Sequence, residues 1–121
     1  MKAALVDTLA RLPAAPTPAY PEGAPFVHAL AHGSMSVELY APGSNADGRD
    51  RQQPHAQDEL YVVQRGRATL RIDTPAGTQT FDAAPGDVLF VPAGAAHRFD
   101  TFTPDFTTWV IFWGPDGGER P

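Results

Sequence analysis

The sequence of 121 residues contains no cysteine and no long apolar run. Without cysteine, the chain has no disulfide framework, no thiolate metal site and no cysteine nucleophile. The apolar stretch at residues 3–6 is interrupted at Asp7 and is too short for a signal peptide. No run approaches the roughly 20 residues that a membrane helix needs. We therefore expect a soluble, cytoplasmic protein with no membrane partner.

Charged residues are also scarce. They make up 19% of the chain, and 14 acidic residues against 9 basic ones give a net charge of −5. An acidic surface repels phosphate backbones, and no helix-turn-helix pattern precedes the strands, so nucleic acid is not an expected partner. What the sequence has in excess is turn formers, with 13 prolines and 11 glycines. These residues suit short strands joined by tight turns and argue against a helix bundle.

The strand pattern begins at Phe26. Residues 68–73 show it most clearly, since Ala68, Leu70 and Ile72 alternate with polar residues, as in a half-buried antiparallel strand. About eight segments of this kind are expected, at residues 26–31, 35–40, 58–64, 68–73, 78–83, 87–92, 97–102 and 107–113. Short strands at such regular spacing predict an all-β sandwich or closed barrel within one domain.

The two ends of the chain have a different texture. Leu5, Leu9 and Leu12 have helical spacing, which fits a short amphipathic helix, although a strand or a loose arm would also fit. The five prolines between residues 13 and 25 then indicate an extended connector. Residues 114–121 form a polar tail that need not be ordered. The expected organisation is an N-terminal arm (1–25), a β-barrel (26–113) and a C-terminal tail (114–121).

Residues 53–59 carry the most informative pattern. If they form a strand, Gln53, His55, Gln57 and Glu59 share one face. A buried histidine and carboxylate need a partner, and a metal ion is one such partner. His97, which follows a Pro-x-Gly turn at residues 92–94, is the candidate for the remaining ligand. Two histidines and one carboxylate bind divalent transition metals and leave positions open for water, oxygen or substrate.

Gln53 could add a neutral oxygen to this set, or it could hydrogen-bond to a metal-bound water. Each candidate also has an ordinary structural explanation. His55 and His97 would then be interior histidines bonded to their neighbours, Glu59 would pair with Arg51 or Arg98, and Gln53 would be a rim residue.

Several other residues are expected to be structural. His28 and His32 read as surface side chains, and Arg49 and Arg51 as solvated loop charges that could instead receive an anionic substrate. Trp109, Ile111 and Trp113 share one face of the last strand, where core and subunit contact is favoured over an aromatic pocket wall. Leu60 and Val62 point away from the site face, which suggests a second layer or a partner subunit and hence a homodimer.

The chain resembles the cupin family, whose two sequence motifs it matches in register. Gln53, His55, Glu59 and Gly66 stand at the first motif, and Gly86, Pro92, Gly94 and His97 at the second. Three positions depart from the pattern: Gln53 replaces the first histidine, Gly48 lies one residue too close, and Thr101 replaces an asparagine. A neutral amide oxygen is a weaker donor than imidazole, so metal affinity should be lower than in cupins with the full set.

The resemblance implies a double-stranded β-helix, an antiparallel jelly-roll barrel with the site in its mouth, and it also suggests a homodimer. Cupins include dioxygenases, isomerases, decarboxylases, ligand-sensing domains and storage proteins, so the fold does not name the function. We expect a divalent Fe, Mn, Ni or Zn ion at His55, Glu59 and His97, with Gln53 as a fourth group. A small oxygen-bearing molecule would bind beside it, with dioxygenase or isomerase chemistry. The alternative is a non-catalytic module that binds a sugar or small acid, with the metal site either kept or lost. No separate acid/base pair is visible.

Overall fold

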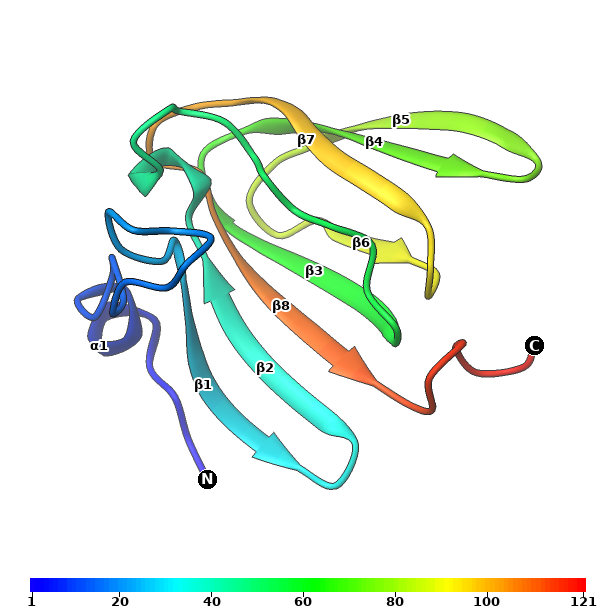
Figure 1. The fold of residues 1–121 in the computed structure, drawn as a ribbon, viewed down its shortest axis with the longest axis horizontal. Coiled ribbons are helices and arrows are strands. Elements are labelled where there is room, and N and C mark those ends of the chain that lie inside the picture. The colour runs from blue at the N-terminus through cyan, green and yellow to red at the C-terminus, as the bar shows by residue number, and fades with distance from the viewer.

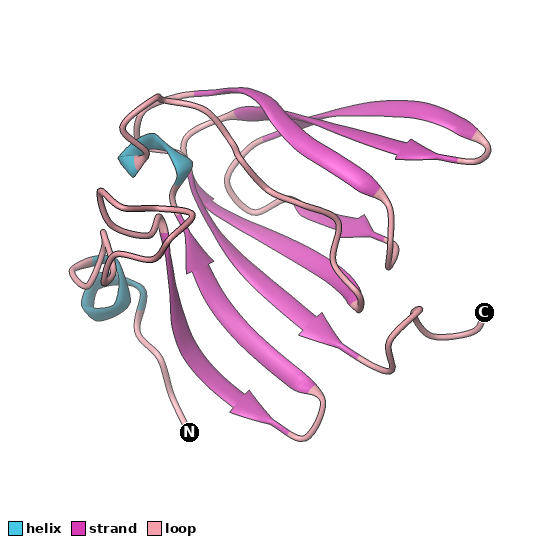
Figure 2. Ribbon diagram, viewed as in Figure 1, coloured by secondary structure: helices cyan, strands magenta, loops and turns pink.

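The computed structural model describes residues 1–121 and is built almost entirely from antiparallel strands (Figures 1 and 2). The strands are β1 (Phe26–His32), β2 (Met35–Tyr40), β3 (Asp58–Arg65), β4 (Ala68–Thr74), β5 (Gly77–Ala83), β6 (Val88–Val91), β7 (Ala96–Phe102) and β8 (Thr107–Trp113). The helical elements are α1 (Leu5–Leu9) and a single 3-10 turn, η1 (Pro42–Ser44). This architecture confirms the all-β prediction. The strands are short because glycine or proline residues stand near their ends, where they favour turns.

The strands form two sheets that face each other as a jelly roll (Figure 1). One sheet has five strands in the order β1-β2-β8-β3-β6, and the other has three in the order β5-β4-β7. Consecutive strands β3 and β4 lie in different sheets, so the chain turns a corner between them at Gly66. The strands converge at one end of the molecule and diverge at the other, as Figure 1 shows.

The core lies between the two sheets. Ala68, Leu70 and Ile72 of β4 all point inward, as their alternation predicts, and pack with Tyr61 of β3 and Phe99 of β7. Tyr61 and Phe99 meet edge to face, with ring centroids 4.9 Å apart. Aromatic rings in this arrangement supply a large apolar area and a fixed geometry. They form the floor beneath the end of the sandwich where the two histidines lie.

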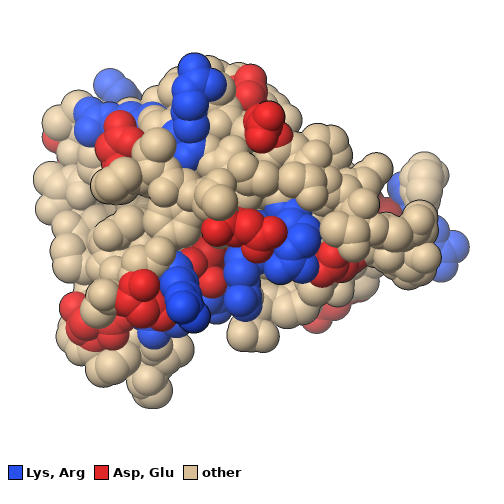
Figure 3. Space-filling view, turned by 90° about the horizontal axis from the view of Figure 1, so that it is seen from above, with Lys and Arg blue, Asp and Glu red and all other residues tan.

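The outer faces of the two sheets differ in character. The three-stranded sheet carries interleaved acidic and basic side chains (Figure 3), with Arg71 bonded to Asp73 at 2.7 Å and to Asp100 at 2.9 Å. The five-stranded sheet instead presents apolar side chains that are aligned across four strands by the register: Val37, Leu60, Val62, Val88, Phe90, Trp109 and Ile111. We call this set the apolar outer face.

The expectation that Trp109, Ile111 and Trp113 belong to the core is therefore wrong. They lie on the outer side of β8 and are only half-buried. The residues of β8 that face inward are those of the opposite parity, among them Val110, which is buried in the core.

The terminal segments fold back against the strands. Helix α1 ends at Leu9, so Leu12 lies outside it, and a bridge between Ala14 and Ala24 closes the proline-rich segment into a loop. The polar tail, which need not have been ordered, is tied to the chain by the amide of Gly117, which donates to the Ala56 carbonyl. Neither helix has the length or the apolar character needed to cross a lipid bilayer.

Candidate metal centre

Residues 53–57 do not continue β3 as the sequence pattern suggested. The strand begins at Asp58, and the segment before it is an irregular loop. Gln57 consequently does not share a face with Glu59, because its side-chain amide donates to the carbonyls of Ser34 and Gly114 at 3.0 and 2.8 Å. Pro54 explains part of the difference, since it has no N–H to donate to a sheet ladder.

The loop is nevertheless held firmly, by the turn that precedes the second histidine. The amide of Gly94 donates to the His55 carbonyl at 2.8 Å, and the amide of Ala93 donates to the Asp58 carboxylate at 3.0 Å. Gly94 has a φ of +78°, a left-handed conformation that favours glycine. One turn therefore fixes the backbone of His55 and, three residues later, directs His97 into the site.

Three side chains from three different segments converge at the open end of the sandwich. His55 comes from the loop, Glu59 from β3 and His97 from β7, and their donor atoms all lie within 4.8 Å of one another. Nε2 of His97 is 2.9 Å from Oε1 of Glu59, and Nε2 of His55 is 3.6 Å from Oε2. The structure thus brings together the three residues that the spacing singled out.

These donor atoms are buried, yet they have no hydrogen-bond partner. Nε2 of both histidines and both carboxylate oxygens of Glu59 lack one. The close contacts between them do not have hydrogen-bond geometry, so these atoms are left without partners within the chain. Glu59 is 1% exposed, and neither Arg51 nor Arg98 pairs with it. Buried nitrogen and oxygen atoms without a partner destabilise the fold unless a cation binds them.

The orientation of the His97 ring also suits a ligand. Its Nδ1 lies 2.9 Å from the carbonyl oxygen of Ala95, which can only accept a hydrogen bond. Nδ1 therefore carries the proton in the neutral ring, and the lone pair is on Nε2, which points into the site. Metal-binding histidines are commonly oriented by a hydrogen bond of this type at the other ring nitrogen.

The two histidines respond differently to burial. Burial lowers the pKa of His55, and the charge of Glu59 only partly offsets this effect. Burial would also lower the pKa of His97, but its close contact with the Glu59 carboxylate outweighs burial and raises the pKa. The lowered pKa keeps His55 in the neutral form that a metal ligand needs, whereas the raised pKa of His97 means that a cation would compete with a proton for this ring.

A buried carboxylate that the sequence analysis did not single out, that of Asp50, holds together the segments that carry the site residues. Asp50 is 2% exposed and accepts hydrogen bonds from the Tyr40 hydroxyl at 2.5 Å and from the Phe99 amide at 2.8 Å. Asp50 also accepts a hydrogen bond of 2.8 Å from the side-chain amide of Gln52. The amide oxygen of Gln52 in turn accepts a hydrogen bond from the Tyr61 hydroxyl. Asp50 therefore joins the loop that bears His55 to the strand that bears His97.

A cavity of about 320 Å³ opens beside His55 and Glu59, two of the three candidate metal ligands. Its wall is formed by Ala19, Tyr20, Phe26, Glu38, Tyr40, Arg51, Gln52, Gln53, His55, Glu59, Val110 and Phe112. The last strand contributes Phe112 to this wall from its inward face, and the Phe112 ring lies 4.8 Å from that of His55. The alternative that Trp109 and its neighbours form this wall is wrong, since they lie on the other face.

The remaining candidates take varied positions. Gln53 borders the cavity but is exposed. His28 and His32 are exposed, as expected, and Arg49 is an exposed loop residue. Arg51 is not a free loop charge, because its guanidinium pairs with Glu22 and lies 4.5 Å from the centre of the Tyr20 ring.

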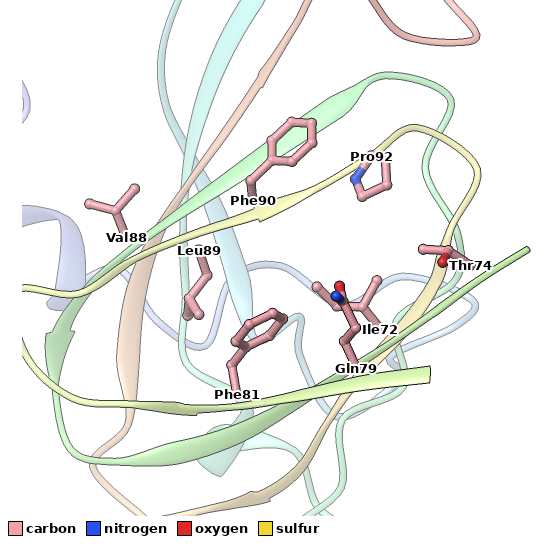
Figure 4. A pocket seen from close by; sticks show the side chains of 8 residues that line it. All are labelled: Ile72, Thr74, Gln79, Phe81, Val88, Leu89, Phe90 and Pro92. Carbon is pink, nitrogen blue, oxygen red and sulfur yellow. The ribbon is translucent and has the colours of Figure 1, made fainter. Parts of the chain in front are cut away.

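A second cavity, of about 460 Å³, lies at the free edges of the two sheets (Figure 4). Figure 4 shows Leu89 turned toward Phe81 in the space between β6 and β5, while Val88 and Phe90 point to the other side of β6. The wall is mainly apolar and carries no acidic or basic side chain. It offers no set of metal ligands comparable to that of the first cavity.

Comparison with known proteins identifies the family. The model of the cupin domain matches residues 36–111, which span β2 to β8. The chain belongs to the cupin family. The jelly roll and the two matched motifs are consistent with this assignment.

Individual cupins provide further comparison. An uncharacterised protein of Streptomyces coelicolor, SCO3923, is 41% identical over 91 residues, which cover 75% of this chain and 81% of that protein. Acireductone dioxygenase 1 of Pectobacterium atrosepticum is 38% identical over 66 residues, or 52% of this chain and 37% of the dioxygenase. Among solved structures, the plu4264 protein of Photorhabdus luminescens aligns with a TM-score of 0.56 at 20% identity, covering 74% of this chain and 73% of that one. The last similarity reflects the fold alone.

Proposed function

We propose that this cupin binds a divalent transition metal through His55, Glu59 and His97 and holds a small oxygen-bearing molecule in the adjoining cavity. The observation that carries the proposal is the convergence of buried donor atoms from these three residues without hydrogen-bond partners. Two imidazoles and one carboxylate suit iron, manganese, nickel or zinc. When bound, such an ion supplies Lewis acidity and open coordination positions.

In this proposal, neighbouring residues orient the two metal-binding histidines and exclude water from one side of the metal site. The Ala95 carbonyl fixes the His97 ring, and Phe112 packs against His55. Gln53 stands at the rim of the cavity, where its amide oxygen would be a fourth ligand or a partner for a metal-bound water. We propose dioxygenase chemistry ahead of isomerase chemistry, because the second relative is named as a dioxygenase and matches over 66 residues.

The experiment is elemental analysis of protein purified without chelator and without nickel resin. We expect about one metal ion per chain in the wild type and none in His55→Ala. His28→Ala is the matched control, because it removes an exposed histidine from β1 and should leave the metal content unchanged. Wild-type protein that carries no metal and takes up none on incubation would contradict the proposal and favour a metal-free binding module for a sugar or small acid.

Reaction type is tested next, on the iron(II)-loaded protein. Oxygen uptake with a panel of small hydroxy acids and hydroxy ketones would support dioxygenase chemistry. Turnover of a panel member without oxygen uptake would support isomerase chemistry. Ligands that raise the melting temperature without forming product would indicate a binding module, since tight binding to the native state stabilises it.

We also propose that the protein is a homodimer, with residues 1–25 as an arm, residues 26–113 as the barrel and residues 114–121 as a tail. The apolar outer face supports the dimer, because apolar side chains that gather on one face and include the exposed Val88 and Phe90 are typical of interaction sites.

A further inference from the structure

The cavity beside the metal centre contains a second carboxylate, that of Glu38 on β2. In the sheet register Glu38 pairs with Val110, and Val110 pairs with Tyr61. Paired residues share a face of the sheet, so Glu38 lies on the inner face with Tyr61 and with Glu59, which comes two residues before Tyr61 in β3. Strand spacing and rise place the Cα atoms of Glu38 and Glu59 about 12 Å apart. This separation leaves room for a small molecule between the two side chains.

Apart from Glu59, whose oxygens belong to the candidate metal centre, Glu38 is the carboxylate on this wall that the protein leaves without a partner. Its side chain makes no hydrogen bond or ion pair within the chain, and burial raises its pKa against a smaller opposing effect of His28. Two other polar side chains of the wall are engaged, since Arg51 is paired with Glu22 and Gln52 bonds to Asp50. A ligand in the cavity would therefore meet Glu38 as a group still able to form a hydrogen bond.

The surroundings of Glu38 define what that ligand group must be. The only lysine or arginine on the cavity wall is Arg51, and its charge already faces the carboxylates of Glu22 and Asp47. The remaining wall includes the rings of Phe26 and Phe112. A hydroxyl or ammonium group can donate to Glu38 here, whereas a carboxylate or phosphate would meet a like charge without compensation.

We propose that Glu38 is the specificity-determining residue of the cavity. The ligand presents a carboxylate or carbonyl oxygen to the metal centre and a hydroxyl or ammonium group to Glu38, and ligands with an anionic group at each end are rejected. This inference rests on the metal centre proposed above and adds the substrate class.

The test uses three probes with the same three-carbon skeleton and a carboxylate at one end. β-Alanine ends in an ammonium group, 3-hydroxypropionate in a hydroxyl and malonate in a second carboxylate. Each is titrated into Co(II)-loaded protein, and binding is followed by the change in the visible absorption of the metal. Metal content and melting temperature are measured in every variant before titration.

We expect Glu38→Gln, which keeps the side-chain shape but removes the charge, to shift the ratio of malonate to β-alanine affinity by about tenfold or more toward malonate. Because the ratio is compared between variants, the intrinsic tendency of malonate to chelate metals cancels. Glu38→Asp should retain the wild-type preference, since it retains the charge. Asp116→Asn removes an exposed carboxylate of the tail and is the control for net charge.

The outcomes separate the two proposals. Wild-type protein that binds no Co(II) would overturn the metal centre and, with it, the premise of this inference. Protein that binds Co(II) but shows the same affinity ratio in Glu38→Gln as in the wild type would overturn the role of Glu38 and leave the metal centre standing. A shift of equal size in Asp116→Asn would likewise overturn it, because the effect would then be one of overall charge.

Discussion

At the scale of single residues, the protonation of His97 links pH to the stability of the fold. A histidine in the unfolded chain has a pKa near 6.5, and the folded protein raises that of His97. Protonation of His97 therefore stabilises the folded state fully at pH values below the unfolded pKa, and this contribution is lost as the pH rises through the folded pKa. For the metal-free protein, we expect His97→Gln to reduce the free energy of unfolding more at about pH 6 than at about pH 9. Urea unfolding in the presence of EDTA measures the difference.

His55 provides the matched comparison, because its pKa is shifted the other way. Its contribution is present above the unfolded pKa and is lost as the pH falls through the folded one. His55→Gln should therefore show the opposite pH trend to His97→Gln. The same trend in both variants would rule out this account of the proton. Metal binding adds a dependence of its own, since protons compete with the ion and the metal-bound protein should be more stable at higher pH.

Sequence spacing predicted the three donors but not the residues that support them. His55, Glu59 and His97 belong to recognisable motifs, and two imidazoles with a carboxylate indicate a metal site from the sequence alone. Asp50 and Glu38 belong to no motif that would indicate their roles. Asp50 lies in a segment that reads as a polar loop, and its role depends on the Phe99 amide, which only the fold brings near. Glu38 lies in a strand whose inward face could not be assigned until the register was known.

At the scale of elements, the corner between β3 and β4 carries the chain from one sheet to the other. Gly66 has a φ of +71°, and a Cβ atom there would lie 2.4 Å from Oγ1 of Thr103 and 2.7 Å from Cα of Phe106. We expect Gly66→Ala to lower the free energy of unfolding by at least about 2 kcal/mol, because it adds a clash to the backbone strain. Chemical denaturation measures the loss.

Gly86→Ala separates the two causes. Gly86 also has a positive φ, of +90°, but a Cβ there would meet nothing within 4 Å. The free energy of unfolding of this variant should fall only by the cost of placing alanine at a positive φ, because the added Cβ meets no other atom. Equal losses in Gly66→Ala and Gly86→Ala would show that packing at the corner contributes nothing.

Element boundaries show where sequence patterns stop being informative. The alternation of residues 68–73 predicted the inward face of β4 correctly, because each buried residue contacts the core through its own side chain. The same alternation failed at residues 53–57, where the backbone bonds to the 92–94 turn and to the C-terminal tail instead of to a neighbouring strand. A pattern of period two describes a strand only where a ladder exists to impose it.

At the scale of the whole molecule, the two sheets expose different surfaces to their surroundings. The charged face of the three-stranded sheet (Figure 3) is suited to water, whereas the apolar outer face of the other sheet is not. Val88 and Phe90 on β6 are 59% and 51% exposed, and Leu60 and Val62 continue the face on β3. Two identical apolar faces can bury each other about a two-fold axis without any complementary charge. This geometry is why we assign the face to a second copy of the chain.

Phe90→Glu tests that assignment. A carboxylate buried within the proposed apolar interface would lose its hydration without gaining a partner, so the variant should be a monomer at concentrations where the wild type is a dimer. Light scattering coupled to size exclusion gives the mass of each. Thr80→Glu is the control, because Thr80 is exposed on β5 opposite Arg71 and lies on the charged sheet. A wild-type protein with the mass of one chain would refute the dimer, as would a Phe90→Glu variant that keeps the mass of two.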